Sequence, residues 1–104
     1  MNYLIYLKKI IQSKKNGDPN QPYTAQLFFK GLEEIQKKFG EEAIELIIAS
    51  ASKNKTQTIY ESADVLFHLL VLLTENNISI EEIVDELKKR SGVSGLEEKS
   101  NRKK

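Results

Sequence analysis

Residues 61–73 read ESADVLFHLLVLL, and the second part of this stretch, residues 65–73, is apolar except for His68. A helix over this part would be apolar nearly all round, and such a helix has to be buried on most sides. The helical pattern extends from about Thr56 to Glu75. The sequence therefore predicts a long central helix, against which the rest of the chain has to pack.

The N-terminal segment is predicted to form a short amphipathic helix over residues 2–14. Its apolar residues fall on one side at helical spacing: Tyr3, Leu7, Ile10 and Ile11. Residues 14–22 contain a glycine and both prolines of the chain, which is typical of a loop. This loop is expected to separate the first helix from the remainder of the protein.

A long helix is predicted between this loop and the central helix. It starts near Tyr23 or Thr24, and residues 53–55 form a turn after it. From Leu32 onward, one face is kept in register by steps of three and four residues: Leu32, Ile35, Phe39, Ala43, Leu46 and Ser50. Glycine lowers helix stability by about 1 kcal/mol relative to alanine. Gly31 and Gly40 are therefore the points where this helix is expected to bend.

The C-terminal part begins with a turn at Asn76-Asn77 and continues into a last helix that ends near Gly92. Ser79 and Glu82 have the spacing of a capping box, in which each satisfies a free backbone N–H of the other. Residues 93–104 are polar and are expected to form a flexible tail. Because no segment alternates like a strand, the prediction is an all-α domain of four to five helices over residues 1–92.

The bulk composition narrows the class of protein. A chain of 104 residues is expected to form one domain, and its net charge of +1 gives no general attraction to nucleic acid or anionic membranes. It contains no cysteine, which excludes a disulfide framework and a thiolate metal site. The longest apolar run is too short to span a membrane, and the N-terminus lacks a secretory pattern. The expected location is the cytoplasm.

Carboxylates recur at helical spacing in two places. On the long helix Glu45 follows Glu41 by four residues and Glu42 by three, and on the central helix Asp64 follows Glu61 by three. On the long helix they are predicted to lie roughly opposite the apolar face described above. Like charges at this spacing repel each other. If the two helices are antiparallel and bring these groups together, the carboxylate oxygens could bind Mg²⁺ or Mn²⁺. Because Mg²⁺ usually holds its substrate through phosphate oxygens, this predicts a phosphorylated substrate.

The alternative interpretation is solvated charge on amphipathic helices. This alternative explains Asp64 poorly, because aspartate is a weak helix former and here directly precedes the most apolar run of the chain. Lys38 lies one turn before Glu42, and Lys30 lies two turns before Lys38. Both are candidates to neutralise phosphate charge, with a solvated lysine as the alternative.

Three further residues have open roles. His68, the only histidine, follows Asp64 by four residues and so shares its side of the helix. It could contact substrate, support a metal ligand or act as a base, or it could be a satisfied buried histidine. Tyr23 and Thr24 either begin a helix or contact the substrate.

These segments resemble a known family. The acidic pattern alone resembles the signature of the all-α nucleoside triphosphate pyrophosphatases, the MazG-like superfamily. The wider context, over about residues 3–90, resembles the phosphoribosyl-ATP pyrophosphatase family. The segments that carry this likeness are Tyr23-Thr24-Ala25-x-Leu27, Lys30-Gly31-Leu32, Lys38-x-Gly40-Glu41-Glu42-Ala43-x-Glu45-Leu46 and the run from Glu61 to Leu73. That family commonly has tyrosine where this chain has Phe67.

The resemblance implies hydrolysis of 1-(5-phosphoribosyl)-ATP to phosphoribosyl-AMP and pyrophosphate, the second step of histidine biosynthesis. It implies Mg²⁺ held by four carboxylates: Glu42, Glu45, Glu61 and Asp64. Glu41 is then the candidate to orient or deprotonate the attacking water, while Lys30 and Lys38 bind phosphate. The family is dimeric, which agrees with the expectation that a second subunit covers the apolar central helix in a shared helical bundle.

Two other functions remain open from the sequence. A MazG-like enzyme acting on ordinary or damaged (d)NTPs would carry the same acidic motif. A non-enzymatic helical dimerisation module would carry the carboxylates as surface charge and would bind no metal through Glu45 and Asp64.

Overall fold

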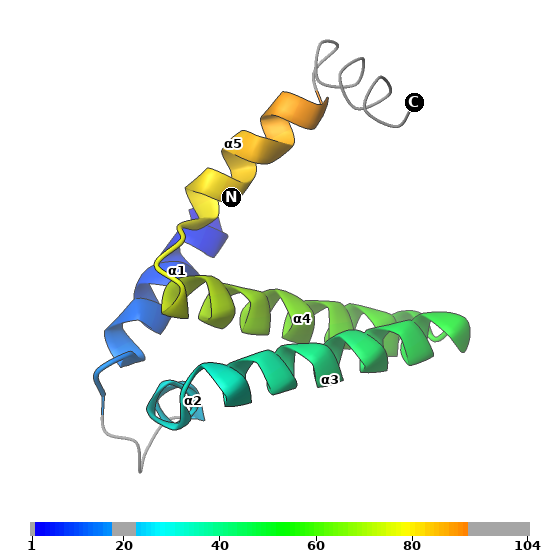
Figure 1. The fold of residues 1–104 in the computed structure, drawn as a ribbon. Helices are drawn as coiled ribbons and strands as arrows, with labels where there is room; N and C mark the ends of the chain where they lie inside the picture. The colour runs from blue at the N-terminus through cyan, green and yellow to red at the C-terminus, as the bar shows by residue number, and fades with distance from the viewer. Residues whose placement is uncertain (1, 18–22, 92–104) are drawn as a thin grey trace.

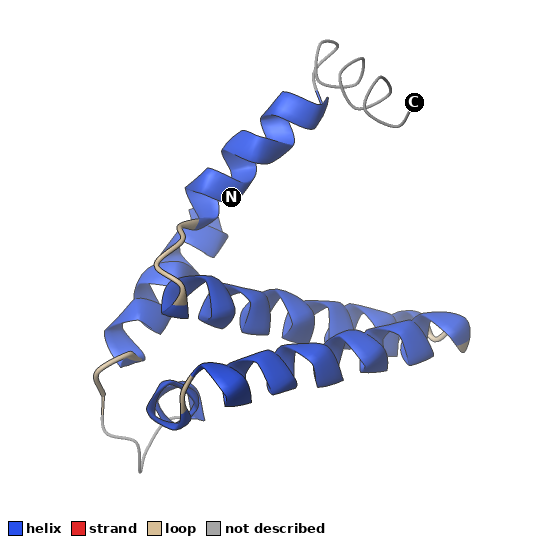
Figure 2. Ribbon diagram, viewed as in Figure 1, coloured by secondary structure: helices blue, strands red, loops and turns tan. Residues whose placement is uncertain are grey.

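A computed structural model describes residues 2–17 and 23–91. Within these residues it contains five α-helices and no strand: α1 (Asn2–Lys14), α2 (Tyr23–Lys30), α3 (Leu32–Ala51), α4 (Lys55–Glu75) and α5 (Ile80–Ser91) (Figure 2). The predicted all-α fold is therefore confirmed. Part of the predicted loop, residues 18–22, and the predicted helix end and tail, residues 92–104, lie outside the described residues.

Helices α3 and α4 form an antiparallel hairpin and lie side by side along their lengths (Figure 1). Helix α2 packs against α3, while α1 contacts α2, α4 and α5. Helix α5 leads away from the hairpin (Figure 1). The main buried cluster combines residues from all five helices: Ile11, Leu27, Phe28, Ile35, Leu70, Val71, Leu73 and Ile80. The core therefore lies at the end of the hairpin where α3 begins and α4 ends.

The chain itself buries or partly buries all but one apolar residue of the run in α4. Leu70, Val71 and Leu73 are buried, whereas Leu66 is exposed. The short helices gather around the C-terminal half of α4, so the chain itself covers part of this run, and cover of the remainder by a second subunit stays a prediction. Within residues 2–17 and 23–91, no single helix is long and apolar enough to cross a membrane, and α4 and α5 reach that criterion only as a pair bent by 111°.

Several of the exposed apolar side chains lie along the two helices of the hairpin. Ile44, Ile47 and Ile48 form an exposed stripe on α3, and Ile59 and Leu66, seven residues apart, form one on α4. We call these the α3 stripe and the α4 stripe. Exposed apolar surface of this kind commonly marks a site of protein association.

The predicted long helix is interrupted at Gly31 and continues without interruption through Gly40. Gly31 has φ 99° and ψ −176°, a conformation that is essentially limited to glycine. Its N–H donates to the carbonyl of Leu27, and its carbonyl accepts from Ile35, so it serves the end of α2 and the start of α3. The prediction of one continuous helix was therefore wrong, whereas the bend expected at Gly31 is confirmed as a break and the one at Gly40 is absent.

Local capping sets the other helix boundaries. The Asn54 side chain accepts the backbone N–H of Gln57 at 3.0 Å and thereby caps the N-terminus of α4. The predicted capping box of α5 is confirmed. Ser79 N–H donates to the Glu82 carboxylate at 2.8 Å, and Glu82 N–H donates to the Ser79 hydroxyl at 3.2 Å.

The apolar side predicted for α1 is only partly correct. Ile11 is fully buried, but Tyr3 and Ile10 are exposed, while Leu4 packs against the core. The difference arises because α1 contacts three other helices, so the surface that it buries is set by tertiary packing and not by one stripe.

Candidate active site

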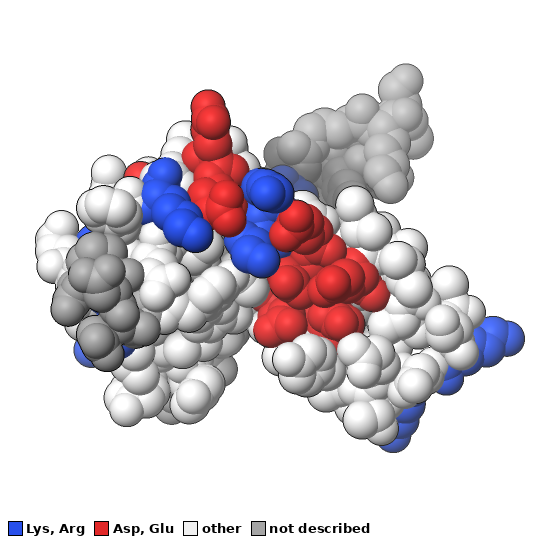
Figure 3. All heavy atoms as spheres, turned by 90° about the horizontal axis from the view of Figure 1, so that it is seen from below, with Lys and Arg blue, Asp and Glu red and all other residues white. Residues whose placement is uncertain are grey.

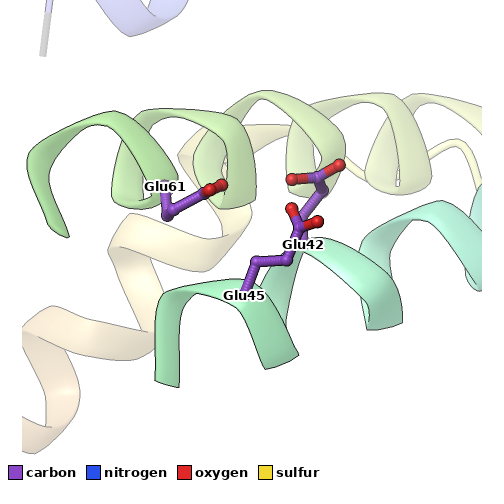
Figure 4. Close-up of side chains that lie close together, drawn as sticks. All are labelled: Glu42, Glu45 and Glu61. Carbon is purple, nitrogen blue, oxygen red and sulfur yellow. The ribbon is translucent and has the colours of Figure 1, made fainter. Parts of the chain in front are cut away.

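Three of the predicted carboxylates meet across the α3–α4 hairpin. Glu42 and Glu45 extend from α3 and Glu61 from α4, and an oxygen of each lies within 4.8 Å of the others. Their side chains converge in the space between the two helices (Figure 4). Acidic side chains also form a patch with basic side chains at its edge (Figure 3). The antiparallel hairpin therefore brings together residues that are up to nineteen positions apart, as the helical spacing predicted.

Two oxygens of this carboxylate cluster are buried without a partner among the described residues. Glu42 Oε2 and Glu61 Oε1 are both inaccessible to solvent and accept no hydrogen bond there. A buried acceptor that lacks a partner costs about 1–3 kcal/mol, and more if it is charged. A divalent cation between the helices would satisfy both oxygens. The donor set, consisting only of carboxylate oxygens, is the kind that Mg²⁺ and Mn²⁺ prefer.

The pKa of Glu42 is raised from 4.5 to about 7. Burial of the carboxyl is the largest cause, followed by its hydrogen bond with Glu45 and the negative charges of Glu45, Asp64 and Glu61. All these causes disfavour the ionised form. A bound cation would act in the opposite sense, so metal binding and ionisation of Glu42 are expected to favour each other.

This raised pKa predicts a stability that depends on pH when no metal is present. Below about pH 4.5 Glu42 is protonated in both the folded and the unfolded state. The folded state then avoids the cost of an ionised, buried carboxylate, and its stability is highest. As the pH rises to about 7, the unfolded state loses this proton first, and the folded state becomes less stable. In EDTA, Glu42→Gln should therefore melt at a higher temperature than the wild type, by a margin that grows from about pH 5 to about pH 8. Thermal denaturation across this range measures the margin, and a margin independent of pH would contradict the prediction.

The carboxylates do not lie opposite the buried side of α3, as the sequence suggested. Glu42 is seven residues from both Ile35 and Ala49, the two buried apolar residues of this helix, so all three share one side. Of the predicted apolar face, Ile35 is fully buried, whereas Phe39, Ala43 and Leu46 are only partly buried. The prediction placed the carboxylates away from the core by their charge alone, whereas Glu42 shares a side of the helix with its two buried residues.

Two predicted acidic residues lie beside the carboxylate cluster. Asp64 does not join the three oxygens within 4.8 Å, but it is close enough to raise the pKa of Glu42. Glu41 points more toward solvent, and its carboxylate lies 3.6 Å from Lys38 Nζ. Asp64 therefore contributes charge to the cluster, while Glu41 and Lys38 form an ion pair at its edge.

His68 links α4 to Tyr23 of α2. Its Nδ1 lies 2.8 Å from the backbone carbonyl of Asp64, and its Nε2 lies 2.9 Å from the Tyr23 hydroxyl. A carbonyl oxygen only accepts, so Nδ1 carries the proton, and the Tyr23 hydroxyl donates to Nε2 of the neutral ring. The His68 ring is buried, and the rings of Tyr23 and Phe67 pack edge-on against it. Both ring nitrogens are thus occupied by contacts within the chain.

Tyr23 lies among the charged residues of the site. Partial burial raises the pKa of its hydroxyl, the carboxylates of Glu42 and Asp64 raise it further, and Lys38 opposes them. Its proton is directed to His68, which leaves the oxygen free to accept from another group. Of the other predicted residues on α2, Thr24 is partly buried, and Lys30 is exposed at the C-terminal end.

A cavity of about 230 Å³ adjoins the carboxylate cluster near the turn between α3 and α4. Its lining combines two of the carboxylates with polar and apolar residues: Glu45, Ile48, Ala49, Ser52, Asn54, Gln57 and Glu61. Gln57 was missed from the sequence. Its signal was the spacing of four residues to Glu61, which places both on one side of α4. A larger polar cavity, of about 360 Å³, lies between α1, α4 and α5 and includes none of the predicted site residues.

Comparison with known proteins agrees with the geometry. The family model described as PRA-PH, phosphoribosyl-ATP pyrophosphohydrolase, matches residues 4–91. The phosphoribosyl-ATP pyrophosphatase of Rhodobacter capsulatus is 43% identical over 102 residues, which cover 98% of this chain and 99% of that protein. The protein of the same name from Dinoroseobacter shibae is 41% identical over 102 residues, covering 98% and 100%. The one from Neisseria meningitidis serogroup C is 43% identical over 96 residues, covering 92% and 90%.

Proposed function

Because the chain belongs to the phosphoribosyl-ATP pyrophosphohydrolase family, we infer that it hydrolyses phosphoribosyl-ATP to phosphoribosyl-AMP and pyrophosphate. It is accordingly a hydrolase of histidine biosynthesis that acts on a phosphoanhydride. The observation that carries this conclusion is a match to one family over nearly the whole chain, including both helices that bear the carboxylates. Neither a MazG-like (d)NTP pyrophosphatase nor a non-enzymatic dimerisation module is favoured by these matches.

We propose that Mg²⁺ is the cofactor, with Mn²⁺ as a substitute, and that Glu42, Glu45, Glu61 and Asp64 hold it. The convergence of three of these carboxylates and the two unpartnered buried oxygens support this assignment. When bound, such a metal neutralises charge on phosphate oxygens and lowers the pKa of a coordinated water. The carboxylates of these residues line a pocket. Their ionised, negatively charged state is unfavourable until a cation binds there.

We propose that Glu41 orients the attacking water and accepts its proton. Glu41 adjoins Glu42 in the chain but faces solvent, so a water molecule can reach it. Its contact with Lys38 holds the side chain at the edge of the carboxylate cluster. A carboxylate next to the reacting phosphate is suited to general-base catalysis when it lies within hydrogen-bond reach of the water.

Lys38 and Lys30 are proposed to bind the phosphate groups of the substrate. Lys38 is in the second turn of α3 and lies near both Glu41 and Tyr23. Lys30 follows Tyr23 by seven residues, so the two share a side of α2. We propose that the Tyr23 hydroxyl, held by His68, contacts the substrate from this side, with Thr24 beside it. In this assignment His68 is a positioning residue and not the base.

The activity is tested with a panel of nucleotides. With Mg²⁺, the purified protein should release pyrophosphate from phosphoribosyl-ATP, and EDTA should abolish the release. Each dNTP should turn over far more slowly at the same concentration, since the family is defined by its phosphoribosylated substrate. Equal or greater turnover of dNTPs would overturn the substrate assignment and favour the MazG-like alternative.

We further propose that the active form is a homodimer. The support is the α3 stripe together with the α4 stripe, which leave apolar side chains exposed on the half of the hairpin that holds the carboxylates. A symmetric pair of subunits could bury these stripes against each other in a shared helical bundle. The cytoplasmic location expected from the sequence remains a prediction.

A further inference from the structure

Glu61 is held by Gln57, a residue to which the proposed reaction assigns no role. Gln57 Nε2 donates a hydrogen bond to Glu61 Oε2 at 2.9 Å. Glu61 is buried, its other oxygen has no partner among the described residues, and its carboxylate faces those of Glu42 and Glu45 (Figure 4). The hydrogen bond therefore restrains the orientation of a carboxylate that points into the cluster.

The position of Gln57 makes this contact informative. It is the third residue after the cap Asn54, the place where a glutamine or glutamate often turns back to bond the cap residue. Glu82 occupies the same place in α5 and does turn back, accepting from the N–H of Ser79. The Gln57 side chain reaches forward to Glu61 instead. Two residues at equivalent helix positions in one chain are thus used differently, and only Gln57 contacts a candidate metal ligand.

An amide suits this position chemically. It donates a hydrogen bond without carrying a charge, so it can orient Glu61 and still leave the full negative charge of the cluster available to a cation. A lysine here would neutralise Glu61 itself, and a glutamate would add repulsion. Gln57 is exposed, so little packing holds its side chain. The hydrogen bond to Glu61 is therefore the interaction that orients it.

We propose that Gln57 is a positioning residue that orients the Glu61 carboxylate for the divalent metal. This inference rests on the metal site of the proposed function and extends it to a residue outside the acidic motif. The backbone N–H of Gln57 is what Asn54 caps, so a change of its side chain leaves the cap of α4 in place.

The test measures Mn²⁺ binding directly, by electron paramagnetic resonance of free Mn²⁺ in titrations of the full chain. Gln57→Met keeps the length of the side chain and removes its donor. It should weaken Mn²⁺ binding about 10-fold or more, the range typical for groups that support metal ligands. The matched control is Gln36→Met, at an exposed position of α3, which should bind Mn²⁺ like the wild type.

A double-mutant cycle decides whether the effect passes through Glu61. Melting temperatures in EDTA are compared for the wild type, Gln57→Met, Glu61→Gln and the double variant. Gln57→Met should lower the melting temperature less in the Glu61→Gln background than in the wild type, because the carboxylate that it bonds is gone. Additive shifts of the melting temperature would overturn the proposal even if Mn²⁺ binding changed. Unchanged Mn²⁺ binding would overturn it even if the shifts were coupled.

If the wild type binds no Mn²⁺, this proposal falls with the metal site. If it binds Mn²⁺ but fails to cleave phosphoribosyl-ATP, only the substrate assignment falls.

Discussion

Replacing Glu45 by glutamine, or Asp64 by asparagine, should lower the rate of pyrophosphate release about 100-fold or more at saturating Mg²⁺. Even residues that only support metal ligands are commonly worth about 10- to 100-fold, and a ligand itself is expected to be worth more. Each change removes a charged oxygen donor from the proposed metal site. Each also removes negative charge from a cluster whose members raise the pKa of Glu42 by repulsion.

The same variants should therefore be no less stable than the wild type when metal is absent. Their melting temperatures in EDTA are expected to stay level or rise, while Mg²⁺ should stabilise them less than it stabilises the wild type. Glu33→Gln, at an exposed glutamate in the first turn of α3, is the control for loss of one acidic charge elsewhere. A variant that keeps near-normal activity at saturating Mg²⁺ does not alter an essential ligand, and that residue would leave the proposed site.

The wild-type chain should form a stable dimer at micromolar concentration, and Ile47→Asp should convert it to a monomer. Ile47 is 66% exposed in the α3 stripe, so an aspartate there leaves the fold of a single chain largely intact. A charge buried in a subunit interface would instead be strongly unfavourable. Light scattering gives the mass in solution, with 11.9 kDa expected for the monomer.

The matched control for assembly is Tyr3→Asp. Tyr3 is 68% exposed on α1, at a site outside both apolar stripes, and its replacement should leave the dimer in place. Leu70→Asp is unsuitable as a test of assembly, because Leu70 is buried within its own chain and its replacement would disrupt folding first. A wild-type chain that is monomeric and folded at high concentration would exclude the proposed dimer.

Features set by local sequence were predictable. The capping box at Ser79 and Glu82 and the turns before α4 and α5 depend on a few neighbouring residues, and the structure has them where the sequence places them. The carboxylates of α3 and α4 could likewise be paired, because helical spacing and an antiparallel hairpin suffice to bring them together. In each of these features, the role of a residue depends only on its own helix and on one adjacent helix or turn.

Features set by packing were not predictable. Gly31 and Gly40 were equal candidates for a bend from the sequence, and only the backbone conformation at Gly31 shows which of them separates two helices. The placement of Glu42 on the buried side of α3 depends on how α4 lies against it, and hydrophobicity assigns a glutamate to the outside. Gln57 has no motif of its own, so its contact with Glu61 becomes visible only in three dimensions. The coverage of α4 depends on where three short helices pack.

The uneven distribution of the core has a consequence for how the site exists in solution. The main buried cluster takes nothing from α3 beyond Ile35 and nothing from α4 before Leu70, so the carboxylate-bearing half of the hairpin has no share in it. Segments with few buried contacts open at lower free energy than the core, and their amides exchange hydrogen with solvent sooner. We expect hydrogen exchange to be fast around Glu45 and Glu61 in the lone, metal-free chain and to slow when either the cation or the second subunit is present. Cation and partner would then each reduce local opening of this half, so metal binding, dimerisation and the rigidity of the site would be linked.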